Sequence, residues 1–328
     1  MKKAIIIGIT GQDGAYLAKL LLAKEYHVIG VTRSANKHNF KRLEFLGIDN
    51  SIEFVEMPQI SFNQICDILK KYNPDEIYNL SAQSSVGASF NIPIETVSYN
   101  ILSVINWLEA IYTTKPDAKF YQASSSEMFG NVSEQVLPLR ESNIFCPASP
   151  YGVSKASAHW ITINYRESKK VHTTCGILFN HESCLRGDSY IVKKALNTAL
   201  KIKMGLSKTP LILGDLSVRR DWGYAPSYVE AMWLMMQHEV AGDFIICSGN
   251  CISLKELIML IFAKLDLSFD KNVQINASLF RPLELETIYG DNSKSKDELG
   301  WSYNLTTEEL IDQLILDETA FIEWELKK

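Results

Sequence analysis

Two short segments of the sequence combine side chains that could move a proton and a hydride. Tyr151 and Lys155 are four residues apart, which places them on one face of a helix. The lysine charge can lower the pKa of the phenol, so Tyr151 can accept or donate the proton of a hydroxyl group. The run 123–127 (ASSSE) offers serine hydroxyls for hydrogen bonding and one carboxylate as a base. Taken singly, a tyrosine–lysine pair arises by chance on helix surfaces, and serine runs usually cap turns.

A third segment, 8–14 (GITGQDG), predicts a dinucleotide site. Its glycines follow a predicted strand and open a predicted helix, so a pyrophosphate can approach the free amides at the helix N-terminus. The second predicted strand ends at Arg33, where an NAD-selective enzyme usually has an acidic residue for the ribose. A cation there suits a 2′-phosphate, so the sequence favours NADP over NAD.

The elements that must position these residues alternate along the first half of the chain. Apolar runs predict strands at 4–8, 27–32, 77–80, 120–123 and 173–179. Helical spacing of apolar residues predicts helices at 14–25, 65–72, 97–111 and 151–168. This alternation predicts an α/β fold of Rossmann type, a doubly wound parallel sheet with helices on both faces.

The pattern changes after residue 180. Runs 244–247 and 273–275 resemble isolated strands, and Ser253 with Glu256 and Thr306 with Glu309 form capping boxes that open two helices. We therefore expect a dinucleotide-binding domain at 1–180, which holds the catalytic residues, and a smaller C-terminal α/β lobe at 181–328. The lobe would mainly bind substrate, and the chain would interleave between the two parts.

Composition excludes several classes of protein. The 328 residues are 46% apolar and carry a net charge of −5, so bulk attraction to nucleic acid or acidic membranes is not expected. No apolar run is long enough for a transmembrane helix. The six cysteines are dispersed, so we expect reduced thiols and no metal site. A cytoplasmic protein is predicted.

Together these features resemble an extended short-chain dehydrogenase/reductase, and more closely the GDP-mannose 4,6-dehydratase family. The similarity runs nearly end to end, and its more specific stretches are 178–187 (LFNHESCLRG) and 220–233 (RDWGYAPSYVEAMW). The resemblance implies that the catalytic residues are Ser125, Glu127, Tyr151 and Lys155. The expected cofactor contacts are Gly8, Ile9, Thr10, Gly11, Gln12, Asp13, Gly14, Arg33, Glu56, Met57, Leu80, Ser81, Ala82, Gln83, Ser84, Tyr151, Lys155, His181 and Arg186. The expected substrate contacts are Ser85, Ser126, Asn180, Lys193, Arg220, Arg281 and Glu284.

The activity implied by the resemblance is 4,6-dehydration of a GDP-hexose. NADP, with NAD as the alternative, would be a cofactor that is recycled in each turnover. Related dTDP-glucose dehydratases have an Asp before the Glu, but here that position is Ser126. Glu127 is therefore expected to take the C5 proton and to pass it to the departing C6 hydroxyl. An epimerase or 4-keto reductase would not need this carboxylate. A non-catalytic NADP-sensing protein would not need all four of the predicted catalytic residues.

Departures from the family pattern leave the hexose open between GDP-mannose and GDP-N-acetylglucosamine. Ser125 replaces a Thr, Cys184 a Pro, Ser227 an Asp and Glu95 a Tyr, and the run 214–217 (GDLS) replaces Gly-Asn-Leu-Asp. The loop at 34–38 also departs from the family. The resemblance further implies a homo-oligomer, a dimer or tetramer, in which helices 97–112 and 151–168 pair with those of a second copy. Trp107 and Trp160 could belong to that contact or to the core.

Overall fold

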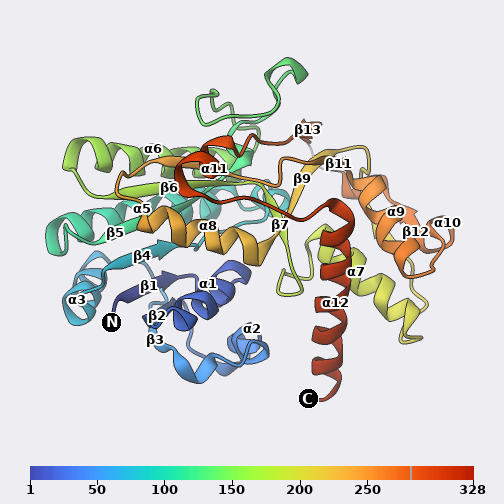
Figure 1. The fold of residues 1–328 in the computed structure, drawn as a ribbon, viewed down its shortest axis with the longest axis horizontal. Coiled ribbons are helices and arrows are strands. Elements are labelled where there is room, and N and C mark those ends of the chain that lie inside the picture. Colours follow the sequence, from blue (N-terminus) through green and yellow to red (C-terminus); the bar gives the residue numbers. More distant parts are fainter. Residues whose placement is uncertain (281–282) are drawn as a thin grey trace.

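The computed structural model describes residues 1–280 and 283–328 and is built on a seven-stranded parallel sheet (Figure 1). The strand order is β10-β6-β5-β4-β1-β2-β3. Nearly every side chain of the inner strands is buried, because helices cover both faces. The strands are β1 (Lys3–Ile7), β2 (His27–Thr32), β3 (Glu53–Glu56), β4 (Glu76–Asn79), β5 (Lys119–Ser125), β6 (Thr173–Leu178) and β10 (Asp243–Ile246).

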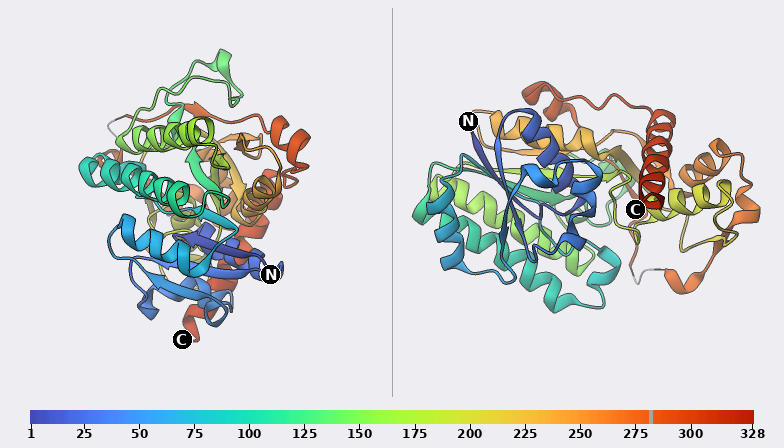
Figure 2. Two further views of the ribbon diagram at one scale, coloured as in Figure 1. Left: turned by 90° about the vertical axis from the view of Figure 1, so that its left-hand side faces the viewer. Right: turned by 90° about the horizontal axis from the view of Figure 1, so that it is seen from below.

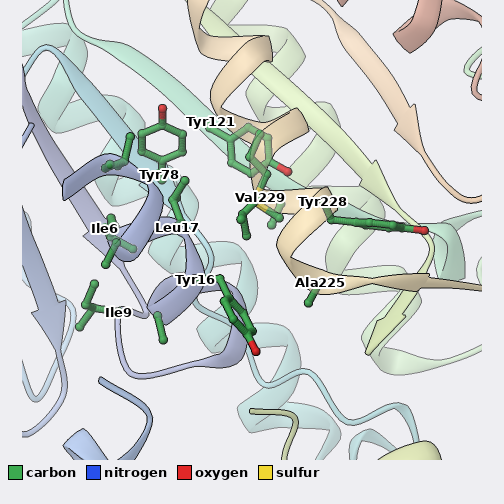
Figure 3. Close-up of a cluster of buried hydrophobic side chains, with 14 of the residues drawn as sticks. Ile6, Ile9, Tyr16, Leu17, Tyr78, Tyr121, Ala225, Tyr228 and Val229 are labelled. Carbon is green, nitrogen blue, oxygen red and sulfur yellow. The ribbon is translucent and has the colours of Figure 1, made fainter. Parts of the chain in front are cut away.

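Two helical layers sandwich this sheet (Figure 2). One layer consists of α3 (Phe62–Tyr72), α5 (Pro93–Thr114) and α6 (Pro150–Lys169), and the other of α1 (Gln12–Ala23), α8 (Ala225–Gln237) and α11 (Ser293–Leu299). Figure 3 shows the second layer packing on the sheet: Leu17 of α1 and Val229 of α8 lie near Tyr78 and Tyr121. This architecture confirms the predicted Rossmann-type fold class.

A smaller group of elements lies beyond the carboxyl ends of the strands, with its own apolar core. Its strands are β7 (Asn180–Glu182), β8 (Leu211–Leu213), β9 (Arg219–Tyr224), β11 (Cys251–Ser253), β12 (Val273–Ile275) and β13 (Thr287–Ile288). Its helices are α7 (Ile191–Lys203), α9 (Leu254–Lys264), α10 (Phe269–Asn272) and α12 (Thr307–Leu326). Both predicted capping boxes are present, at the starts of α9 and α12. We refer to this group as the lobe.

The remaining helices are short. They are α2 (Lys41–Phe45), α4 (Val86–Ser89) and the 3-10 helices η1 (Lys37–Phe40), η2 (Asp49–Ser51), η3 (Ser126–Met128), η4 (Glu134–Val136) and η5 (Ala277–Leu279). Within residues 1–280 and 283–328, no helix combines the length and apolar character needed to cross a bilayer.

The expectation of isolated strands after residue 180 is wrong. The predicted strand 244–247 corresponds to β10, which pairs with β6 as the seventh strand of the main sheet, and β12 pairs with β8. The chain leaves the sheet after β6, builds part of the lobe, and returns through α8 to add β10 at the edge. A single apolar run carries no signal of its pairing partner, which is the physical reason for the error.

Candidate functional site

A cleft of about 460 Å³ lies between the carboxyl ends of the sheet strands and the lobe. This is where open α/β sheets bind ligands. The strand β5, its following turn and the start of α6 form one wall, and the segments around β7, α7, β8 and β9 form the other. The cleft brings together the four predicted catalytic residues, Ser125, Glu127, Tyr151 and Lys155.

The start of α6 fixes the tyrosine and the lysine. Ser149 caps the helix by accepting a hydrogen bond from the Gly152 amide at 3.0 Å, and Pro150 occupies the first turn. Tyr151 and Lys155 follow one turn apart, 8% and 5% exposed. The Lys155 Nζ donates a hydrogen bond to the Ala123 carbonyl at 2.8 Å and lies 5.9 Å from the centre of the Tyr151 ring.

Burial dominates the electrostatics of this pair. It lowers the pKa of Lys155 to about 8, although the negative charge of Asp13 opposes the shift. Burial also raises the pKa of Tyr151, against a hydrogen bond from Ser125 that favours the phenolate. Tyr151 is therefore a phenol at neutral pH in the free protein, and it needs a nearby positive charge to act as a base.

Glu127 lies on η3, directly after β5. The Ser125 Oγ accepts a hydrogen bond from the Glu127 amide at 3.3 Å and so caps this short helix. The turn directs Ser125 and Glu127 to the cleft, whereas Ser126, a predicted substrate contact, is buried and is not among the described residues that line it. Both Glu127 and Tyr151 line the cleft, and the negative charge of Glu127 contributes to the raised pKa of Tyr151.

The glycine loop has the shape of a phosphate cradle. Gly8 has a φ of +87°, and a Cβ added at Gly14 would lie 2.4 Å from the Gly8 carbonyl oxygen. Gly11 is the N-cap of α1, and no described side chain caps the helix there. The first amides of α1 are thus left for a ligand, so these residues fit the pyrophosphate of a dinucleotide.

Side chains of the same loop attach it to β7. The Asp13 carboxylate lies 3.0 Å from the His181 Nε2, and Gln12 bonds the His181 carbonyl at 3.3 Å and the Ser183 hydroxyl at 2.8 Å. Burial disfavours the charge of Asp13, but His181 outweighs this effect and lowers the pKa of Asp13 to about 2. Asp13 and His181 both line the cleft, so a fixed negative charge faces Lys155.

The other expected cofactor contacts divide into two groups. Leu80, Ala82 and Ser84, after β4, line the cleft. The remaining ones lie outside its described lining: Gly8–Thr10, Gly11, Gln12 and Gly14 in the loop, Arg33, Glu56 and Met57 at the ends of β2 and β3, and Ser81 and Gln83. Arg33 and Glu56 are exposed, and Glu56 accepts a hydrogen bond from the Ala35 amide at 3.0 Å.

Arg186, which is partly buried, and Glu182, which is buried, form a charge pair on the cleft wall. The Arg186 Nε is 3.8 Å from the Glu182 Oε2, and neither atom has a hydrogen-bond partner among the described residues. Burial raises the pKa of Glu182, against the positive charge of Arg186. The Arg186 guanidinium also stacks 3.9 Å from the centre of the Tyr190 ring. Buried polar atoms without partners indicate a place for a ligand. Sequence reasoning named Arg186 as a cofactor contact and did not name Glu182 or Tyr190, which also line the cleft.

Four of the predicted substrate contacts, Ser85, Asn180, Arg220 and Glu284, line the cleft. Arg220 is buried, and its Nη2 donates to the Glu284 carboxylate at 3.0 Å and to the Leu285 carbonyl at 2.7 Å. This fixes a cation on the cleft wall, where an anionic group can approach it. Arg281, another predicted contact, lies outside the described residues.

The predicted substrate contact Lys193 is not placed on the cleft. It is 1% exposed, and its Nζ donates to both Glu318 oxygens, at 2.7 and 2.6 Å, and to the Cys184 carbonyl at 2.6 Å. The next residue, Lys194, lines the cleft instead, and its Nζ bonds the Ile212 carbonyl at 2.7 Å. We therefore leave Lys193 out of the proposed site. Sequence reasoning missed Lys194.

One cluster outside the cleft resembles a set of metal ligands. His159, Cys175 and Asp243 offer ligand atoms within 4.8 Å of one another. Asp243, however, is held by the Arg166 guanidinium at 3.0 and 2.8 Å, and the His159 Nδ1 is hydrogen-bonded to Ser124 at 2.9 Å. A cation already balances the carboxylate, so we assign no metal to this cluster.

Comparisons with known proteins agree with this geometry. A family model described as GDP-mannose 4,6 dehydratase matches residues 5–314. The chain is 39% identical over 324 residues to GDP-mannose 4,6 dehydratase 1 of Arabidopsis thaliana, which covers 96% of this chain and 89% of that one. It is 36% identical over 351 residues to GDP-mannose 4,6-dehydratase of Vibrio cholerae, at 97% and 94% coverage.

Solved structures share the fold at lower identity. RMD from Pseudomonas aeruginosa complexed with NADPH superimposes with a TM-score of 0.78 at 22% identity, covering 97% of this chain and 99% of that one. The dTDP-glucose 4,6-dehydratase of Bacillus anthracis in complex with NAD gives 0.85 at 19% identity, with 99% and 98% coverage. Given the family match and the relatives above, the chain belongs to the GDP-mannose 4,6-dehydratase family.

Proposed function

We propose that the protein is a hydro-lyase that converts a GDP-hexose to its 4-keto-6-deoxy product. The observation that carries this proposal is the presence of the Glu127 carboxylate in the same cleft as Ser125, Tyr151 and Lys155. The last three residues are the set needed for oxidation at a sugar hydroxyl, and the carboxylate adds the base needed to eliminate water. Relatives named GDP-mannose 4,6-dehydratase support the same activity.

In the oxidation step, Tyr151 takes the proton of the substrate C4 hydroxyl. The hydrogen bond from Ser125 and the positive charge of Arg186 oppose the effect of burial on the pKa of this phenol. The Lys155 ammonium, 5.9 Å from the centre of the ring, can add a second positive charge, and Ser125 also hydrogen-bonds the substrate oxygen. A bound nicotinamide cofactor would supply the redox chemistry, as the acceptor of hydride from C4 and its donor to C6. It ends each turnover in its starting state, so we expect it to stay bound.

In the elimination step, Glu127 takes the C5 proton, which the C4 ketone has made acidic. The C6–O bond then breaks, and the same carboxyl group gives its proton to the departing hydroxyl, which leaves as water. Hydride return to C6 and a proton from solvent at C5 would complete the product, and Tyr151 would release the proton of the C4 hydroxyl to solvent to close the cycle. Assigning both proton transfers to Glu127 is supported by its neighbour, since Ser126 is buried and cannot act as a carboxylic acid.

NADP is the proposed cofactor. The glycine loop fits the pyrophosphate, and the partly buried Arg186 supplies a cation on the same cleft as Tyr151 and Asp13. Arg33 is exposed at the end of β2, where a 2′-phosphate would lie. A preference for NADP over NAD in binding titrations, reduced in Arg33→Ala, would support this proposal. Equal affinities for NADP and NAD in the unmodified protein would contradict it.

One residue of the cleft supports GDP-N-acetylglucosamine as a second candidate substrate. Ser125 stands where the family usually has Thr, so the cleft has one methyl group less beside the substrate. We include GDP-N-acetylglucosamine beside GDP-mannose, because an acetamido group needs extra room.

The decisive experiment is incubation of the cofactor-loaded protein with GDP-mannose, GDP-N-acetylglucosamine and UDP-N-acetylglucosamine in deuterium oxide. We expect loss of one water, one deuterium at C5 and no net consumption of NADPH with a GDP-hexose. Glu127→Gln should abolish water loss, whereas Glu134→Gln, on exposed η4, should not. Net NADPH consumption would indicate a reductase, and C4 inversion without water loss an epimerase. Full activity of Glu127→Gln would exclude the proposed mechanism.

We also propose a homo-oligomer formed through α5 and α6. Apolar side chains of these helices are exposed, with Leu102 at 53%, Val153 at 44% and Trp160 at 58%. A second copy would cover them by pairing helix with helix. Trp107 is fully buried and belongs to the core of its own subunit.

A further inference from the structure

The lobe side of the cleft has an apolar surface that is open to solvent. Ile212, Leu279 and Phe280 line the cleft and are 38%, 50% and 49% exposed. They belong to β8, to η5 and to the residue after it, whereas Tyr151 and Glu127 lie on the opposite wall. Apolar side chains exposed inside a cleft are typical of a surface covered by a flat, apolar ligand group.

One carboxylate lies among these residues. Asp215 lines the cleft in the loop between β8 and β9. The loop packs closely against η5, because a Cβ added at the neighbouring Gly214 would lie 3.0 Å from the Leu279 carbonyl oxygen. The backbone position of Asp215 relative to the apolar surface is thereby restricted.

The orientation of the Asp215 carboxylate is also fixed. Its Oδ1 accepts hydrogen bonds from the Ser217 amide at 2.8 Å and the Ser217 hydroxyl at 2.7 Å. These bonds lower the pKa of Asp215, so the group is ionised at neutral pH. No hydrogen bond to Oδ2 comes from the described residues, so this oxygen keeps both of its acceptor positions. An ionised carboxylate offers no donor.

We infer that Asp215 selects the nucleobase of the substrate by accepting hydrogen bonds from the adjacent N1–H and amino N–H groups of guanine. Ile212, Leu279 and Phe280 would cover the faces of the base. Guanine is the common base that presents two neighbouring donors. Uracil and thymine present one donor between two carbonyl oxygens, which a carboxylate repels, and adenine and cytosine present a donor beside an acceptor. This inference rests on the proposed function, which places a nucleoside diphosphate in the cleft.

The test compares diphosphates that differ only in the base. Calorimetric titration of the cofactor-loaded protein would use GDP, inosine diphosphate, which lacks the amino group, and xanthosine diphosphate, which has an oxygen in its place. We expect GDP to bind about tenfold more tightly than inosine diphosphate, because a hydrogen bond to a charged acceptor is lost. Asp215→Asn should weaken GDP and strengthen xanthosine diphosphate, since the amide can donate to the new oxygen.

Two further variants control for folding and location. Asp270→Asn, on exposed α10 of the lobe, should leave all three affinities unchanged. Phe280→Ala should weaken the three ligands by a similar factor, because it removes stacking and no base-specific contact. Equal binding of GDP and inosine diphosphate by the unmodified protein would overturn the inference, as would an unchanged ratio of GDP to xanthosine diphosphate affinity in Asp215→Asn.

The dehydration assay separates this inference from the proposed function. Base-selective binding that depends on Asp215, without water loss from any GDP-hexose, would contradict the dehydratase proposal and leave the inference standing. Water loss from a GDP-hexose with the same base selectivity in Asp215→Asn would contradict only the inference.

Discussion

Replacement of the buried Lys193 by methionine should strongly lower the free energy of unfolding. The Lys193 Nζ is held by both oxygens of Glu318 and by the Cys184 carbonyl, and the two side chains are 1% and 0% exposed. The pair thus joins α7, α12 and the segment after β7. Without the lysine, the Glu318 carboxylate keeps one described side-chain partner, the Asn197 amide at 3.1 Å. Removing one partner of a buried ion pair typically lowers the free energy of unfolding by about 3–5 kcal/mol.

The free energy of unfolding would be measured by urea titration at pH 7.5, followed by circular dichroism and tryptophan fluorescence. We expect Lys193→Met and Glu318→Leu each to lower it by about 3 kcal/mol or more, because each leaves the other charge buried. The double variant Lys193→Met/Glu318→Leu should recover most of this loss, because no buried charge remains. Single variants that cost less than about 1 kcal/mol, or a double variant that costs their sum, would refute the reasoning.

The single variant should also acquire a pH dependence of known sign. Burial raises the pKa of Glu318, and Lys193 opposes this effect in the unmodified protein. In Lys193→Met the folded-state pKa should rise further above that of the unfolded chain, so the folded state binds the extra proton. The stability of this variant should therefore be greatest below the unfolded pKa and should fall as the pH rises through the folded pKa. No such fall should occur in the double variant.

Three other predictions follow from the cleft and the surface. Tyr151→Phe should lower kcat by about 10²- to 10⁴-fold in the water-loss assay while nucleotide affinity is kept, because only the proton-transfer group is removed. The kcat/KM of the unmodified enzyme should fall above about pH 8, since the pKa of Lys155 is about 8 and its ammonium is lost as the pH rises through that value; a profile flat to pH 10 would contradict this. Trp160→Glu should shift the oligomer toward the monomer in light-scattering measurements, whereas Leu316→Glu, exposed on α12 at 64%, should not.

The main sheet could be predicted because its signal is local. The strand β2 has the predicted bounds, α6 is one residue longer than predicted at each end, and β6 ends one residue earlier than predicted. Buried parallel strands read as short apolar runs, and each is followed by a helix with one apolar face. The placement of the four predicted catalytic residues on one cleft could be anticipated for the same reason, because four-residue spacing on α6 and the run after β5 position the side chains without any knowledge of distant contacts.

The lobe could not be predicted in the same way because its contacts join distant segments. The strand β9 pairs with β7, β11 and β13, which are dispersed over more than a hundred residues, and no short window contains that information. Asp215 and Glu182 were missed for the same reason. Each matters only through the residues that the fold places near it. Asp215 shares the lobe side of the cleft with Phe280, and Glu182 lies beside Arg186.

The misplacement of Lys193 has a local cause, and the sequence contained the signal to avoid it. Successive residues on a helix point about 100° apart, so two adjacent lysines leave the helix in different directions. The buried face of α7 follows Val192, Leu196 and Leu200, and Lys193 lies within this arc, because it is three residues before Leu196. Lys194 lies outside the arc and is left for the cleft. Matching to a motif alone assigns the substrate contact to either lysine. The helical phase assigns it to Lys194 and predicts a buried acidic partner for Lys193. Glu318 is that partner.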